Sequence, residues 1–175
     1  MTPTIAAALA TLTAAEIAAN RAILQREGLA GPDVHFSYVG LVEPDKRILL
    51  TAQSAADGVA DRRVRSMLVD MATNDSWDVV VSIAEDRVVS THKLDHAVDG
   101  QVPVVLDEFH VVEVIKENPE WIAAMAKRGL TDLGKLVINP LSAGVLSDAE
   151  TGRRIQRCFT YVQNTPEDLG WAHPV

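Results

Sequence analysis

The histidines and the single cysteine are the side chains best suited to metal binding or nucleophilic catalysis in this 175-residue chain. His92 and His96 have the i, i+4 spacing that places two metal ligands on one face of a helix. Here the spacing falls across the end of a predicted strand and a linker, where it has no such meaning. The remaining histidines are dispersed, so we expect no metal site.

Cys158 is the only cysteine, so neither an intrachain disulfide nor a thiolate metal cluster can form. It stands in a β-rich run, where a small strand residue is expected rather than a nucleophile. Glu113, Glu117 and Glu120 recur at helical spacing, which is typical of one solvated helix face. No glycine-rich phosphate loop is present. The residues by themselves therefore predict no catalytic constellation.

Composition excludes further classes of function. A formal net charge of -8 and a pI near 5.0 make nucleic acid an unexpected partner, because phosphate backbones are bound by concentrated Lys and Arg. No segment reaches the roughly 20 uninterrupted apolar residues of a membrane span. The first residues lack the basic region of an export signal. Together with the single cysteine, this predicts a cytoplasmic protein.

The elements that would position these side chains follow an order that repeats. Thr13 and Glu16 form the sequence pattern of a capping box, which predicts a helix that runs to Gly28, with Ile17 and Leu24 on its inner face. We expect strands over 34–43, 46–53, 61–71 and 77–94, with a mobile loop at 54–61. After a flexible N-terminus at 1–11, the first domain therefore spans 12–95, and 96–103 is a linker.

The second domain, 104–175, begins the same order again. Asp107 is expected to cap a mostly buried helix, and Asn118-Pro119 to break that helix and start another. Strands are expected over 135–146 and 153–163, and a third from Trp171. The domain would then be incomplete at its C-terminus. The fold class is α+β, with a helix packed on an antiparallel sheet of about four strands in each domain and the second domain truncated.

Several stretches in order resemble the N-terminal region of bacterial copper-containing, topaquinone-dependent primary amine oxidases of the tyramine or phenylethylamine oxidase type. They are LTAAEI, LDEFHVVEVI, AKRGL, NPLSAGV, GRRIQRCFTYVQ and PEDLGWAHPV. The resemblance covers nearly the whole chain from Leu12 and is more specific in the second domain. It implies two small cystatin-like domains, N2-like and N3-like, that precede a catalytic domain in the same chain.

The resemblance also implies an activity for the full-length parent, which would oxidise primary amines to aldehyde, ammonia and hydrogen peroxide using copper and topaquinone. Those cofactors need an Asn-Tyr-Asp/Glu motif and a His-x-His pair. This chain has neither, since Tyr38 and Tyr161 lie in Ser-Tyr-Val and Thr-Tyr-Val. We therefore expect no cofactor in this segment and no activity from it alone. The parent would be a homodimer and the fragment a monomer.

By the same resemblance, the second domain would form part of the substrate channel wall. Motif matching assigns Phe109, Leu141 and Trp171 to that wall, past which a small primary amine such as tyramine or phenylethylamine would move. Aromatic residues at such spacings are otherwise usual in cores and domain interfaces. The alternative is a stand-alone α+β module that binds a peptide or small ligand. A second sheet with its edges covered would favour that module.

Overall fold

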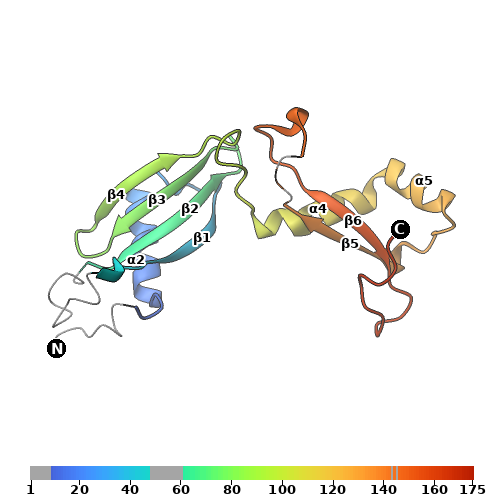
Figure 1. The fold of residues 1–175 in the computed structure, drawn as a ribbon, viewed down its shortest axis with the longest axis horizontal. Coiled ribbons are helices and arrows are strands. Elements are labelled where there is room, and N and C mark those ends of the chain that lie inside the picture. The colour runs from blue at the N-terminus through green and yellow to red at the C-terminus, as the bar shows by residue number, and fades with distance from the viewer. Residues whose placement is uncertain (1–8, 48–60, 143, 145) are drawn as a thin grey trace. The chain divides into compact units, whose positions relative to one another are not determined.

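The computed structural model describes residues 9–47, 61–142, 144 and 146–175. The chain divides into two compact units on either side of the Val102–Pro103 bond, and each is considered by itself (Figure 1). Within the described residues, no helix has both the length and the apolar character needed to cross a membrane.

Helix α2, Ala14–Arg26, opens the first unit and has the predicted ends. The Thr13 hydroxyl accepts a hydrogen bond from the Glu16 amide, while the Glu16 carboxylate accepts one from the Thr13 amide, so the capping box is confirmed. At the other end, Gly28 has a φ of 72°, a left-handed conformation that costs glycine least. The amide of Leu29 then donates to the Leu24 carbonyl, which closes the helix.

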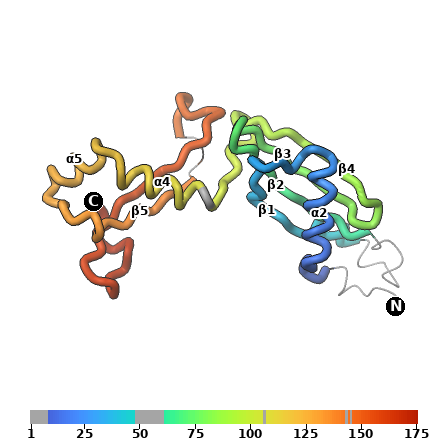
Figure 2. The backbone as a smooth tube through the Cα atoms, turned by 180° about the vertical axis from the view of Figure 1, so that it is seen from behind, coloured from blue at the N-terminus to red at the C-terminus, as the bar shows by residue number. Residues whose placement is uncertain are grey.

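Strands β1 (Val34–Val42), β2 (Arg63–Asp70), β3 (Ser76–Ser82) and β4 (Arg87–Lys93) form one antiparallel sheet in sequence order, with α2 across one face (Figure 2). Two strand predictions were wrong in detail. The expected strand at 77–94 is the hairpin β3–β4, which turns near Asp86 at a φ of 49°. In the expected strand at 46–53, Lys46 and Arg47 are helical; its remainder and nearly all of the expected loop lie outside the described residues.

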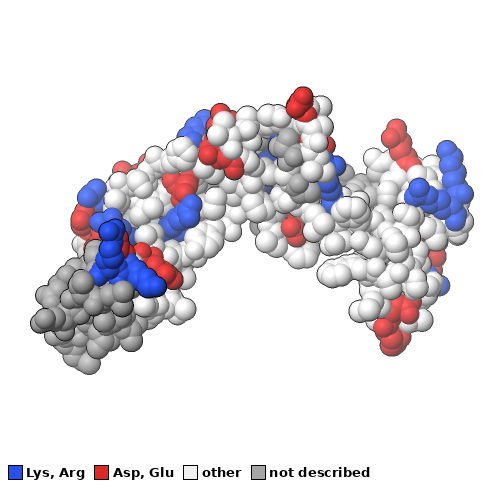
Figure 3. Space-filling view, viewed as in Figure 1, with Lys and Arg blue, Asp and Glu red and all other residues white. Residues whose placement is uncertain are grey.

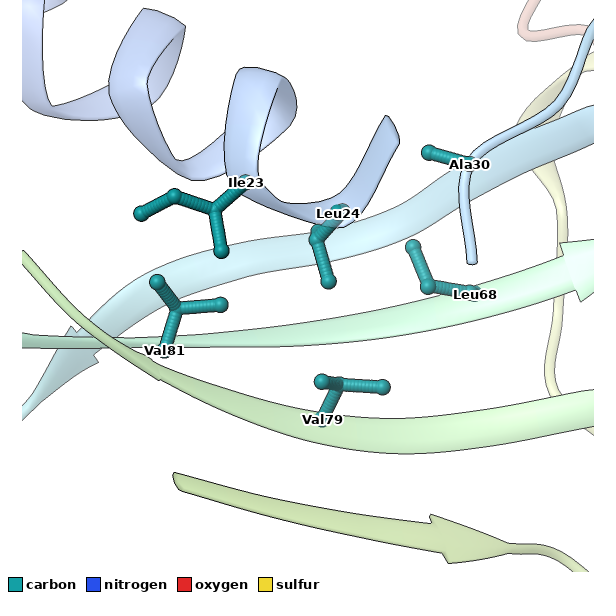
Figure 4. Packing of buried hydrophobic residues seen from close by; sticks show 6 residues of the cluster. All are labelled: Ile23, Leu24, Ala30, Leu68, Val79 and Val81. Atoms are coloured by element: carbon teal, nitrogen blue, oxygen red, sulfur yellow. The ribbon is translucent and has the colours of Figure 1, made fainter. Parts of the chain in front are cut away.

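The core of the first unit lies between the last two turns of α2 and the middle of the sheet (Figure 4). It consists of Ile23, Leu24, Ala30, Leu68, Val79 and Val81. Ile17, expected on the inner face, is 45% exposed, because the core residues of the sheet meet the helix about two turns later, at Ile23 and Leu24. The prediction for Leu24 is confirmed, and that for Ile17 is wrong.

Helices α4 (Val105–Glu117) and α5 (Pro119–Lys127) open the second unit. Asn118 caps α5 as predicted, since its side-chain oxygen accepts from the amides of Glu120 and Trp121. The predicted cap at Asp107 is wrong. Helix α4 begins at Val105, two residues before Asp107. Asp107 therefore lies in the first turn, where its carboxylate pairs with Arg154.

Helix α4 is less buried than its apolar composition predicted. Among the side chains of α4 that the structure describes, the partly covered ones form one stripe, which includes Val111, Val112 and Ile115. Phe109 is 68% exposed and Val114 50%. The reason is that α4 packs on a sheet of only two described strands, which covers one face of the helix.

Strands β5 (Leu136–Leu141) and β6 (Arg157–Val162) make an antiparallel ladder from Leu136 opposite Val162 to Leu141 opposite Arg157. The short 3-10 helices η1 (Leu133–Lys135) and η2 (Asp148–Glu150) precede β5 and β6 respectively. No third strand begins at Trp171, which lies in a turn; the described residues that follow it form an isolated bridge and no strand. That bridge pairs Pro174 with Tyr161 of β6.

Candidate functional site

The two faces of the β5–β6 ladder differ in what covers them. Leu136 and Ile138 point toward the helices and are almost fully buried. Side chains alternate along a strand, so Leu141 and Phe159 lie on the opposite face, and both are nearly half exposed. The second unit therefore has one packed face and one open apolar face among its described residues.

A pocket of about 390 Å³ lies on the packed side, where α4 gives way to α5 over β6. Its lining is Val114, Ile115, Asn118, Glu120, Trp121, Cys158 and Thr160. The indole Nε1 of Trp121 donates to the Thr160 hydroxyl at 3.4 Å, which ties α5 to the strand. Sequence reasoning found the helix break at Asn118 but not the pocket, because Trp121 and Thr160 are 39 residues apart.

Cys158 is in this pocket but is not prepared for nucleophilic chemistry. Burial raises the pKa of its thiol, and no other cause of a shift acts on it. The nucleophilic form of cysteine is the thiolate, so this environment lowers its reactivity. The expectation that Cys158 is a small strand residue agrees with its place in β6.

The three residues expected in a channel wall do not converge within the second unit. Leu141 pairs with Arg157 at one end of the ladder. Trp171 follows Gly170, which lies beside Val137, and Val137 is about 13 Å from Leu141 along β5. Phe109 is on α4, on the other side of the sheet from Leu141. Trp171 is 69% exposed, and all three side chains remain open to a further surface.

The histidine pair forms no metal site. The Nε2 atom of His96 lies 3.0 Å from the Ser76 hydroxyl, and that of His92 lies 3.5 Å from the Asp99 carboxylate. Across the ranges that the structure describes, no group of three or more His, Cys, Asp or Glu side chains could hold a metal ion. These residues do not fit a copper centre, so we derive no metal chemistry from them.

Two arginines of the second unit form ion pairs with carboxylates. Arg157 donates to both carboxylate oxygens of Glu150, at 2.5 and 2.6 Å, and Arg154 pairs with Asp107. Figure 3 shows both basic and acidic side chains on the face in view, with white surface over much of the rest.

Comparison with known proteins identifies both units. Residues 13–91 match the family model "AGAO-like N2 domain", and residues 107–175 match "Copper amine oxidase, N3 domain". The chain belongs to the copper amine oxidase family and consists of its N2 and N3 domains, as the resemblance implied.

Individual relatives agree with this assignment. The chain is 43% identical over 169 residues to a histamine oxidase of Arthrobacter globiformis, a match that covers 95% of this chain and 24% of that protein. It is 36% identical over 165 residues to a primary amine oxidase of Arthrobacter sp. (strain P1), covering 94% and 24%. The chain therefore spans about a quarter of the length of these relatives.

A solved structure shows the same fold. A copper-containing benzylamine oxidase from Hansenula polymorpha matches with a TM-score of 0.72, covering 100% of this chain and 27% of the other. Sequence identity is 17%, so this likeness concerns the fold alone. It confirms the predicted α+β class.

Proposed function

We propose that this chain is the non-catalytic N2–N3 segment of a bacterial primary amine oxidase. The consecutive N2 and N3 matches, in the order of the family, carry the proposal. The full-length protein would oxidise primary amines to aldehyde, ammonia and hydrogen peroxide. Copper and topaquinone would be held in a catalytic domain of the same chain, since the described residues provide no place for them.

The role proposed for this segment is that of a scaffold and part of the channel wall. Phe109, Leu141 and Trp171 are exposed apolar residues, which supports a further protein surface beside them. Because these three residues lie apart within the second unit, a channel that passes them would also need walls formed by the catalytic domain. Apolar and aromatic walls suit an amine that carries an aryl or alkyl group.

The substrate class and assembly are also proposals. Relatives are described as oxidases of histamine and of methylamine, and a small amine such as tyramine or phenylethylamine fits an aromatic wall. We propose a homodimer for the complete enzyme, a monomer for this segment alone, and a cytoplasmic location. Domain limits of 12–95 and 104–175 are proposed for the two folded parts.

The deciding experiment compares the complete gene product with this chain. Both are purified with copper supplied and assayed for hydrogen peroxide release with phenylethylamine, tyramine, histamine and methylamine. We expect oxidation of at least one of these amines by the complete product and none by the 175-residue chain. A complete product that contains no quinone and oxidises none of them would overturn the proposal.

A further inference from the structure

The segment 163–172, which we call the Trp171 loop, carries two large exposed apolar side chains. Trp171 is 69% exposed and Leu169 79%. The ends of the loop lie close together, because the Val162 amide donates to the His173 carbonyl at 2.8 Å. Surface loops of this length with joined ends are usually packed by their own side chains. Burial of Trp171 and Leu169 does not hold this loop, so other contacts must do so.

Asp168 provides hydrogen-bond acceptors inside the loop. Its Oδ2 atom accepts from the amides of Asn164 at 2.8 Å and Thr165 at 3.2 Å, and its Oδ1 atom accepts from the Thr165 hydroxyl at 3.3 Å. Hydrogen bonds from the amides of Thr165 and Asn164 hold the pKa of the Asp168 carboxyl below its usual range. The first half of the loop is therefore organised around one carboxylate.

Gln163 anchors the same loop to the rest of the second unit. Its side-chain Nε2 atom donates to the Asp168 carbonyl at 2.9 Å, and its amide donates to the Lys135 carbonyl at 2.8 Å. On the other side of Asp168, Gly170 lies beside the Val137 side chain. Asp168 thus stands between two points at which the loop contacts the start of β5.

Trp171 follows directly on this braced part of the loop. The Ala172 amide donates to the Leu169 carbonyl at 3.0 Å, which closes a turn around Trp171. Because the indole is largely exposed, its own contacts with this chain contribute little to its placement. The backbone conformation therefore decides where the Trp171 side chain is presented, and that conformation depends on Asp168.

We propose that Asp168 is a positioning residue for the oxidase reaction, whose carboxylate holds the Trp171 loop in the conformation that presents Trp171 to the passing amine. This rests on the proposed function, in which Trp171 belongs to the channel wall. A loop that is ordered in advance avoids the entropic cost of ordering when a substrate arrives. Loss of that order should weaken substrate binding and therefore raise KM more than it changes kcat.

The order of the loop is tested first in the 175-residue chain, by limited digestion with chymotrypsin and mass spectrometry of the sites after Leu169 and Trp171. We expect Asp168→Ala to speed cleavage at these sites about tenfold, because two amides lose their acceptor and the loop opens more often. Cleavage confined to these sites distinguishes local opening from unfolding of the unit. Unchanged cleavage of this variant would overturn the proposal.

Two further variants serve as controls for the digestion. Asp168→Asn keeps a side-chain oxygen that can accept from both amides, so its cleavage should stay within about twofold of the parent chain. Glu167→Ala removes an exposed carboxylate next to Asp168 and should also stay within about twofold. Cleavage of Glu167→Ala as fast as that of Asp168→Ala would overturn the proposal, because any change in the loop would then open it.

The link to Trp171 is tested in the complete enzyme with phenylethylamine. Asp168→Ala should raise KM about threefold with little change in kcat, and Asp168→Asn should restore the parent value. Combined with Trp171→Ala, Asp168→Ala should raise KM no further, because it acts through that side chain.

The outcomes of this cycle separate two kinds of failure. Additive effects of Asp168→Ala and Trp171→Ala on KM would overturn the positioning role of Asp168 and leave the channel wall intact. An unchanged KM for Trp171→Ala would instead reject the channel role of Trp171, and the positioning role would fall with it even if the digestion gave the expected result.

Discussion

At the scale of single residues, the ion pair between Glu16 and Arg62 is the clearest electrostatic feature of the first unit. Both side chains are at least four-fifths buried. The hydrogen bond from Arg62 is the main cause that lowers the pKa of Glu16 from 4.5 to about 2, against an opposing effect of burial. Folding therefore favours the charged form. Its stabilisation is fully present above pH 4.5 and is lost as the pH falls toward about 2.

We predict that Glu16→Gln lowers the free energy of unfolding by about 1–2 kcal/mol at pH 7, since it weakens both the ion pair and the capping box. The difference from the parent chain should shrink as the pH falls from 4.5 toward 2. Urea unfolding across this range measures it. Glu43→Gln, at an exposed position of the same unit, is the control. A constant difference at every pH would contradict the assignment.

Gly28 and Gly31 make a matched pair for testing backbone conformation. A Cβ added at either position would meet no atom within 4 Å, but only Gly28 has a φ in the left-handed region. Gly28→Ala should therefore destabilise the first unit by about 1 kcal/mol, and Gly31→Ala should have little effect. Thermal unfolding of the two variants compares them directly. Equal losses would show that the turn does not require glycine.

At the scale of elements, α2 is held to the sheet by its C-terminal half. Leu24 is fully buried in the core cluster, whereas Ile17 lies on the same helix and is 45% exposed. Leu24→Ala should cost about 2–4 kcal/mol through lost burial and a cavity, and Ile17→Ala less than about 1 kcal/mol. Chemical denaturation gives both values. The reverse order would restore the sequence-based assignment of Ile17 to the inner face.

At the scale of the whole molecule, we propose that Trp171 lies in a channel wall that this chain would form together with the catalytic domain of the complete enzyme. Trp171→Ala in the complete enzyme should raise KM for phenylethylamine roughly fivefold, equivalent to about 1 kcal/mol of lost apolar contact, with a smaller change in kcat. Leu169→Ala, an exposed neighbour in the same loop, is the control. Equal KM values for the two variants would remove Trp171 from the channel wall.

Local signals in the sequence were sufficient for the helix ends. The capping box of Thr13 and Glu16, the Asn118 cap and the left-handed Gly28 each depend on residues within a few positions of one another. These predictions succeeded because the interactions that decide them are short in sequence.

Predictions failed where a distant partner decides the outcome. The sequence predicts a helix cap at Asp107, whereas α4 starts at Val105 and the Asp107 carboxylate pairs with the distant Arg154. The run 77–94 reads as one strand by composition, yet it folds back at Asp86 because β4 pairs with β3. Lys46 and Arg47, at which a strand was expected to begin, are helical.

By itself, the sequence determined the α+β class, the repeated helix-then-strand order and the resemblance to copper amine oxidases, because local propensities and ordered motifs are written along the chain. Only the tertiary structure decided which faces of α2 and α4 are covered, that Phe109, Leu141 and Trp171 lie apart, and that a pocket opens beside β6. Burial and pocket shape arise from contacts between segments far apart in sequence, and no local pattern encodes them.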